Sequence, residues 1–108
     1  MTNIQQIMQM GQQLQARISE MQENLETEEL SATAGGGMVT ATVDGKGTVR
    51  SLRIDPSVVD SEDVEMLEDL VLAAVVEAQK KARDYMEGEM KKATGGLPLG
   101  GMSLPGLF

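Results

Sequence analysis

The residues of this chain that could most readily do chemistry are three consecutive glycines, Gly35 to Gly37, in the stretch "GGGMVTATVDGKGTVRSLRIDP". Glycine-rich loops bind phosphate groups in nucleotide-binding proteins when a helix N-terminus follows and supplies free N–H groups. Here residues 39–43 follow instead, and they are rich in β-branched side chains and alternate with the period of a strand. We therefore interpret the glycines as a bend or bulge between strands, not as a nucleotide site.

A second glycine-rich segment, Asp44-Gly45-Lys46-Gly47, contains the only lysine near these glycines. A phosphate-binding lysine of the Walker type precedes Ser or Thr, whereas Lys46 precedes Gly47. Asp-Gly between two alternating runs indicates a hairpin, because both residues tolerate the positive φ angle that such a turn demands. The sequence therefore predicts a hairpin turn with Gly45 at positive φ.

The residue types that are missing argue against catalysis. The chain has no Cys and no His, so it has no thiolate nucleophile, no imidazole base and no zinc site of the usual ligands. Its clustered acids, residues 62–69, lie at the start of a predicted helix, where carboxylates complement the helix dipole. We expect a protein that is not an enzyme and that has no cofactor, no metal and no small-molecule substrate.

Length and composition indicate one small acidic domain. The chain has 108 residues with 9 Lys and Arg against 17 Asp and Glu, a net charge of −8. The N-terminus lacks the basic and apolar regions of a signal peptide, and no segment reaches the roughly 18 apolar residues of a membrane span. We expect a soluble cytoplasmic protein that makes no membrane contact.

The first 27 residues or so form a predicted helix with a narrow apolar seam. The seam has the three-and-four spacing of heptad a and d positions, with one weak position at a glycine. Its members are Ile4, Ile7, Gly11, Leu14, Ile18, Met21 and Leu25. Because such a seam requires a partner helix or a docking groove, part of this helix is expected to project or to pair between subunits.

Three short strands follow, at residues 30–34, 38–43 and 48–55. Val49 is out of phase with Leu52 and Ile54 in the third strand, which predicts a bulge near residues 48–50 or an outward Val49. A long second helix runs from about residue 61 to 93, and Asp60 or Ser61 is expected to cap its start. The fold class is therefore α+β, an α-β-β-β-α subunit with a three-stranded antiparallel meander. Residues 1–94 form one domain, and residues 95–108, rich in Gly, Pro and Leu, form a flexible tail.

The second helix contains a segment that is apolar on every side, between residues 70 and 76. A three-stranded sheet cannot cover all sides of a helix, so this segment predicts a homodimer in which both subunits bury it. The candidate interface residues are Leu70, Val71, Leu72, Val75 and Val76.

The basic residues gather in a few places. Residues 61–77 carry six acids and no base, whereas residues 78–94 carry five bases and three acids. This pattern fits either dipole complementarity with solubility or phosphate contacts on duplex DNA. The candidate contacts on the second helix are Lys80, Lys81, Arg83, Lys91 and Lys92; a weaker cluster is Lys46, Arg50 and Arg53, and Arg17 is the only base of the first helix. Since the only aromatic residues are Tyr85 and Phe108, single-stranded nucleic acid is disfavoured.

The whole chain resembles the YbaB/EbfC family of bacterial nucleoid-associated proteins. The resemblance rests on "AGGGMVTATVDGKGTVRSLRIDP", on "DSEDVEMLEDLVLAAV", and on "TGG" with a tail ending in "LPGLF". It implies an α-β-β-β-α subunit, a homodimer with projecting helices, and DNA binding with little sequence specificity on the chromosome in the cytoplasm. The chain departs from the family with Val76-Glu77, where members commonly have Asn-Asp, and with a first helix whose only base is Arg17.

Two functions of different classes follow. The first is a homodimeric nucleoid-associated protein that binds duplex DNA, with contact residues assigned from charge alone. The second is a dimeric module that docks another protein through the first helix or the tail. The acidity of the chain favours the second function, and the resemblance favours the first more strongly.

Overall fold

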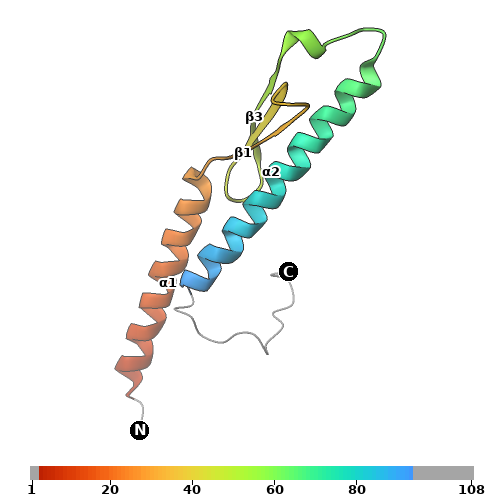
Figure 1. The fold of residues 1–108 in the computed structure, drawn as a ribbon. Helices are drawn as coiled ribbons and strands as arrows, with labels where there is room; N and C mark the ends of the chain where they lie inside the picture. Colours follow the sequence, from red (N-terminus) through yellow and green to blue (C-terminus); the bar gives the residue numbers. More distant parts are fainter. Residues whose placement is uncertain (1–2, 94–108) are drawn as a thin grey trace.

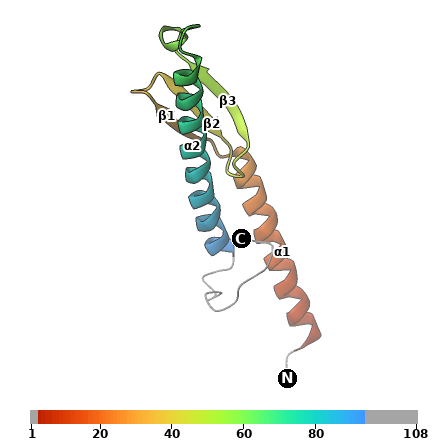
Figure 2. The same cartoon turned by 90° about the vertical axis from the view of Figure 1, so that its right-hand side faces the viewer.

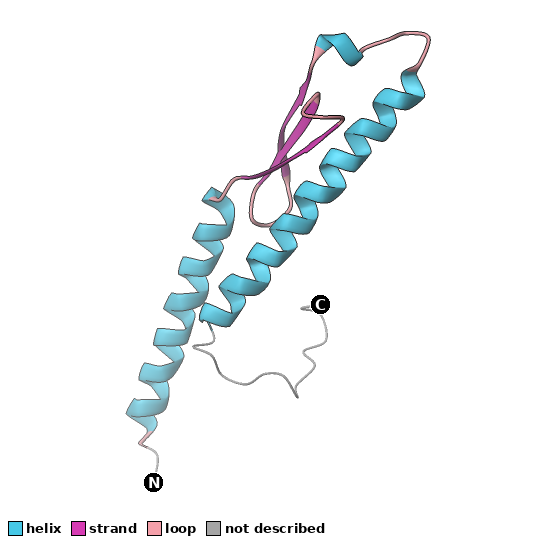
Figure 3. Cartoon of the chain, viewed as in Figure 1, coloured by secondary structure: helices cyan, strands magenta, loops and turns pink. Residues whose placement is uncertain are grey.

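The computed structural model describes residues 3–93, which form two long helices and one small sheet (Figure 1). Figure 3 shows the helices and strands in the order that the sequence predicts. The elements are α1 (Ile4–Thr27), β1 (Leu30–Ala34), β2 (Val39–Val43), β3 (Val49–Ile54), the 3-10 helix η1 (Pro56–Val58) and α2 (Val64–Ala93). The expected α+β fold is confirmed, while the prediction of a flexible tail at 95–108 lies outside the described residues.

The three strands form an antiparallel meander in the order β1-β2-β3. In the register of β2 with β3, Thr42 pairs with Ser51 but Val43 pairs with Val49, so Arg50 is the extra residue of a bulge. The predicted bulge is confirmed. It brings Val49 onto the same face of the sheet as Leu52, because their partners in β2 also share one face.

The core lies between α2 and the first two strands. Ala74, Ala78 and Ala82 recur every four residues on α2 and are fully buried or nearly so. They pack on the inner face of the sheet, where Val39 and Val43 of β2 have no exposed surface. Since alanine side chains are short, the helix can approach the strands closely, and it packs chiefly on β1 and β2.

Helix α1 contacts the rest of the subunit only near its C-terminal end. Asn3 caps its start by accepting a hydrogen bond from the Gln5 backbone N–H at 3.1 Å. Leu25 is the one buried residue of this helix. Both views of the ribbon show α1 extending beyond the end of α2 (Figures 1 and 2), so the expected projection of the first helix is confirmed.

The glycine turns are built differently from one another. Gly35, Gly36 and Gly37 all have positive φ angles, between 64° and 91°, and form the turn between β1 and β2, as the structural interpretation predicted. In the next turn the positive φ belongs to Gly47, at 88°, and the prediction for Gly45 was wrong. Gly45 is needed for a different reason: a Cβ there would lie 2.8 Å from both Cα and the carbonyl oxygen of Leu25.

The start of α2 also differs from the expected one. The helix begins at Val64, and the side chain of Asp63 accepts a hydrogen bond from the Met66 backbone N–H at 3.3 Å. Asp63 is therefore the capping residue, rather than Asp60 or Ser61. The side chain of Asp60 instead accepts from the Glu62 N–H in the preceding turn, at 2.9 Å.

Replacing Gly45 with Ala should destabilise the protein by about 2 kcal/mol or more, because the new methyl group collides with backbone atoms that cannot rotate away. Gly88→Ala is the matched control, since Gly88 lies in α2 with open space around it. That change should stabilise the helix by about 0.5–1 kcal/mol. Urea unfolding of both variants measures the difference, and equal effects would contradict the assignment of Gly45.

Candidate nucleic-acid interface

Several of the cations proposed as DNA contacts are already engaged within the subunit. Lys46 pairs with Glu26 at 2.8 Å, and Lys92 lies 3.5 Å from Glu89. The Lys81 ammonium donates to the backbone carbonyl of Ser31 at the edge of β1, at 2.7 Å. These side chains therefore hold elements of the fold together as well as carrying charge.

Arg50 is bound to a buried carboxylate, Asp44, which has only 2% of its surface exposed. Its Nη2 and Nε atoms donate to Asp44 Oδ2 at 2.8 and 3.1 Å, from the bulge in β3. Asp44 Oδ1 accepts from the backbone N–H groups of Lys46 and Thr48 at 2.9 and 3.1 Å. This geometry makes Arg50 a structural residue of the β2–β3 turn, and it argues against Arg50 as a DNA contact.

The environment of Asp44 favours its charged form. Burial raises the pKa of Asp44. The hydrogen bonds from Thr48, Lys46 and Arg50, together with the charge of Arg50, lower it by more, so the pKa of this carboxyl lies below its usual value. Sequence reasoning missed this residue. The available signal was an Asp at the start of a tight turn, where its side chain commonly bonds the following backbone N–H groups.

Four of the candidate cations make no ion pair or side-chain hydrogen bond within the described residues. They are Arg17 on α1, Arg53 on β3, and Lys80 and Arg83 on α2. All four residues are exposed. Lys80 and Arg83 are three positions apart on a helix and therefore face the same way, which suits contact with neighbouring phosphates.

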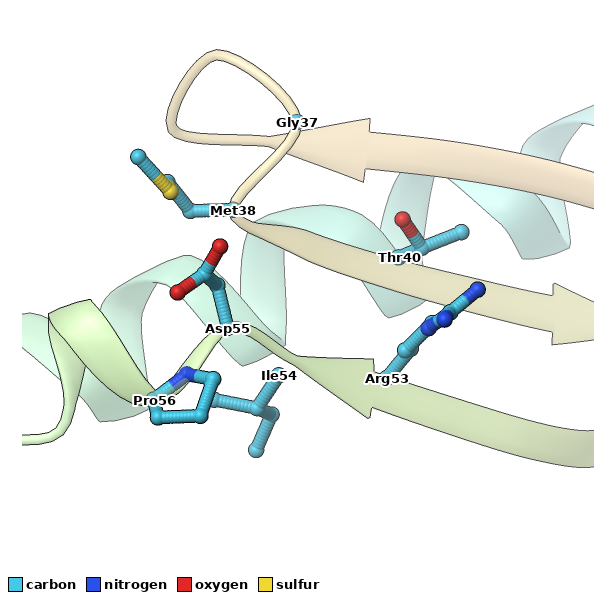
Figure 4. Close-up of a pocket in the computed structure, with 7 residues that line it drawn as sticks. All are labelled: Gly37, Met38, Thr40, Arg53, Ile54, Asp55 and Pro56. Atoms are coloured by element: carbon cyan, nitrogen blue, oxygen red, sulfur yellow. The ribbon is translucent and has the colours of Figure 1, made fainter.

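Arg53 lies on the outer face of the sheet, away from α2. It pairs with Thr40 of β2, and Figure 4 shows the two side chains projecting side by side from neighbouring strands. A shallow pocket of about 370 Å³ lies here, lined by Gly37, Met38, Thr40, Arg53, Ile54, Asp55 and Pro56. Hydrogen bonds from Ser57 lower the pKa of Asp55, so a carboxylate shares the pocket with Arg53 and opposes the binding of an anion.

Tyr85 is the only aromatic residue in the described part of the chain, and it is half-buried on α2. Burial, the charges of Glu89 and Glu28 and hydrogen bonds to both raise the pKa of its phenol group. These interactions direct the phenol group towards the two glutamates.

The candidate dimer residues divide into two groups. Leu70, Val71 and Val75 are half-buried against the core, whereas Leu72 and Val76 are 63% and 54% exposed. Gln79, on the same side of α2 as the two exposed residues, donates to the Gly47 carbonyl at 3.1 Å, so this side faces the start of β3.

The inner face of β3 is exposed as well, with Val49 at 43% and Leu52 at 42%. Together Val49, Leu52, Leu72 and Val76 form an uncovered surface that we call the apolar flank. The unusual phase of Val49 in the sequence is one signal of this surface, but its extent depends on which strands α2 covers.

Residues 3–93 were left with two further classes of site to account for, a metal centre and a membrane span. No group of three or more His, Cys, Asp or Glu side chains could hold a metal ion within this range. None of the helices described here is long and apolar enough to cross a membrane.

The fold and these side chains define a small α+β protein whose uncommitted cations suit a polyanion. The chain belongs to the YbaB/EbfC DNA-binding family, whose model matches residues 1–97. The resemblance seen in the sequence is thereby confirmed, and the family is one of DNA-binding proteins and not one of enzymes.

Relatives and a solved structure agree with this assignment. A nucleoid-associated protein of Clostridium kluyveri is 51% identical over 106 residues, covering 98% of this chain and 89% of the relative. A nucleoid-associated protein of Granulibacter bethesdensis is 49% identical over 106 residues, covering 97% of this chain and 99% of the relative. The crystal structure of an uncharacterized protein from Helicobacter pylori has the same fold, with a TM-score of 0.76 at 21% identity over 88% of this chain and all of that one.

Replacing Asp44 with Asn should lower the free energy of unfolding at pH 7 by about 2 kcal/mol, because charge-assisted hydrogen bonds are lost. The folded pKa lies below the unfolded one, so the advantage of the wild type is complete above about pH 4 and is lost as the pH falls through the folded value. Urea unfolding between pH 7 and pH 3 measures it, with the exposed Asp69→Asn as control. If the difference in free energy of unfolding between the wild type and Asp44→Asn did not shrink in acid, Asp44 would not be stabilising the fold through its charged form.

Proposed function

We propose that the protein binds duplex DNA as a homodimer with little sequence specificity, and that it alters the conformation, compaction or expression of that DNA. The observation that carries the proposal is the pair of uncommitted cations, Lys80 and Arg83, on one face of α2 in a member of a DNA-binding family. The names of the relatives support a place on the nucleoid in the cytoplasm.

The distribution of charge indicates where DNA would lie. Residues 61–77, which include the start of α2, carry six acids and no base, so a polyanion is repelled from that end of the subunit. Residues 78–94 carry a net charge of +2, and residues 1–19 carry Arg17 and no acid. The parts of these segments that belong to α1 and α2 lie towards the other end of the molecule, away from the start of α2 (Figures 1 and 2).

The same charges predict weak binding. Residues 20–29 of α1 and the following link carry five glutamates and no base, beside the basic half of α2. Only a few phosphates can be neutralised, which corresponds to affinities on the order of micromolar near physiological salt. Contacts made by cations to phosphates carry no direct sequence information, so specificity should be low.

A homodimer would solve two problems of the single subunit. It would cover the apolar flank, whose four members are each 42% to 63% exposed. It would also double the number of uncommitted cations, so that Lys80 and Arg83 of both subunits could act on one duplex. The interface is then made by the outer side of α2 and the inner face of β3 in each subunit.

The alternative is a dimeric module that docks a protein and does not contact DNA. The net charge of −8 and the exposed apolar seam of α1 favour it. It shares the dimer with the main proposal and differs only in the partner.

Leu72→Asp and Val76→Asp should each convert the dimer into monomers, because a carboxylate in a contact between apolar side chains loses its hydration without gaining a partner. Light scattering at micromolar concentration should give about twice the 11.6 kDa subunit mass for the wild type and the subunit mass for the variants.

Val59→Asp is the matched control, since Val59 is 58% exposed but lies in the connection before α2. It should leave the dimer intact. A folded wild-type monomer at this concentration, or an equal effect of all three changes, would rule out the apolar flank as the interface.

Replacing Lys80 and Arg83 together with Ala should remove most of the salt dependence of DNA binding. With two cations in each of two subunits, log K for the wild type should fall against log salt with a slope of about −4, and the double variant should lose about three units of that slope. Fluorescence anisotropy on two unrelated duplexes measures it, and the wild type should bind both within a few-fold of each other.

Lys46→Ala with Arg53→Ala is the matched control, since it removes the same charge from the sheet end of the subunit. A larger loss of slope in this control than in the α2 variant would move the contacts to the sheet. If the intact dimer failed to bind either duplex at low salt, the protein-docking alternative would stand in place of the DNA proposal.

A further inference from the structure

The apolar seam of α1 is uncovered over most of its length. Only Leu25 is buried and Met21 half-buried, whereas exposure rises along the seam from 39% at Ile18 to 74% at Ile4. Figure 1 shows the N-terminal part of α1 extending beyond the end of α2. Most of a helix's stability in a protein comes from packing of its apolar face, so a segment with this seam requires a cover.

The foot of the uncovered seam is also the place where α2 ends. Ala93, the last residue of α2, is buried, and the end of α2 lies beside α1 in both views (Figures 1 and 2). The remaining chain is residues 94–108, which is 15 residues. Fully extended it can reach about 50 Å, whereas the seam from Ile4 to Ile18 spans only about 21 Å.

The chemistry of the two segments is complementary. Residues 94–108 contain no charged side chain and six large apolar ones: Leu97, Leu99, Met102, Leu104, Leu107 and Phe108. A side chain at Gly11 would have no heavy atom within 4 Å of its Cβ, and a shallow hollow beside this residue is lined by Met8, Gln12 and Gln15. The hollow can take a leucine or phenylalanine side chain, and the glutamine amides can bond the backbone of a chain rich in Gly and Pro.

We propose that residues 97–108 dock along the seam of α1 in the same chain and cover it from Ile18 towards Ile4. A second copy of α1 is a poorer occupant, because the uncovered seam is only about two heptads long and is interrupted by Gly11. A tail attached at the foot of the seam also has an effective local concentration in the millimolar range, which a separate chain lacks. The proposal does not depend on DNA binding.

Hydrogen exchange on full-length protein tests the docking. Leu104→Asp should raise the exchange rates of the backbone amides of residues 7–18 by about tenfold or more, because a carboxylate in place of a docked leucine releases the tail. Amides of β2 should be unaffected. Ser103→Asp is the matched control, with the same charge one residue away and little expected change. Equal rates in α1 for wild type and Leu104→Asp would overturn the proposal.

Disulfide trapping gives a second readout, since the chain has no Cys of its own. Leu14→Cys with Leu104→Cys should oxidise to a bridge within one chain, whereas Gln13→Cys with Leu104→Cys should not, because Gln13 points to the opposite side of α1. Non-reducing gels separate the products. A bridge between chains, or dimers of Leu14→Cys alone, would show that another copy covers the seam and would refute docking within one chain.

Discussion

A single α-helix is about 10 Å wide and therefore covers only about two strands that lie about 4.8 Å apart. The width of α2 thus determines which strands of the three-stranded sheet are buried and which stay exposed. The alanine stripe of α2 settles onto β1 and β2 and seals the valines of β2 completely. The third strand keeps an apolar inner face because the bulge at Arg50 brings Val49 into phase with Leu52. The core is thus closed, whereas apolar side chains of β3 and α2 stay exposed at one edge.

The few basic residues are divided between holding the fold and remaining available. Arg50 neutralises Asp44 inside the β2–β3 turn, Lys81 ties α2 to the edge of β1, and Lys46 ties the turn to α1. A count of charges along the sequence treats all of them alike. The structure separates them: within the described residues, Lys80 and Arg83 make no ion pair and lie on the exposed side of α2.

The order of helices and strands could be predicted from the sequence because it depends on local periodicity. The bulge could be predicted as well, since Val49 breaks the alternation within its own strand. The roles of Gly45 and Asp44 could not, because they are set by Leu25 and Arg50, which only the fold brings near. The capping residue of α2 was misplaced by two or three positions, since three acids in this stretch, Asp60, Glu62 and Asp63, compete for nearby N–H groups and sequence does not rank them.

The backbone contact between Gly45 and the end of α1 helps to set the direction in which the first helix projects. The Gly45 N–H donates to the Leu25 carbonyl at 2.7 Å, and the lack of a side chain lets the two backbones touch. The helix is about 32 Å long from Leu25 to Ile4, so a rotation of about 10° about the Gly45–Leu25 contact moves its N-terminal end by about 5 Å. The conformation of the β2–β3 turn therefore influences where the N-terminal end of α1 lies. Side chains near Gly45 and Leu25 can change that position without contacting the N-terminal end itself.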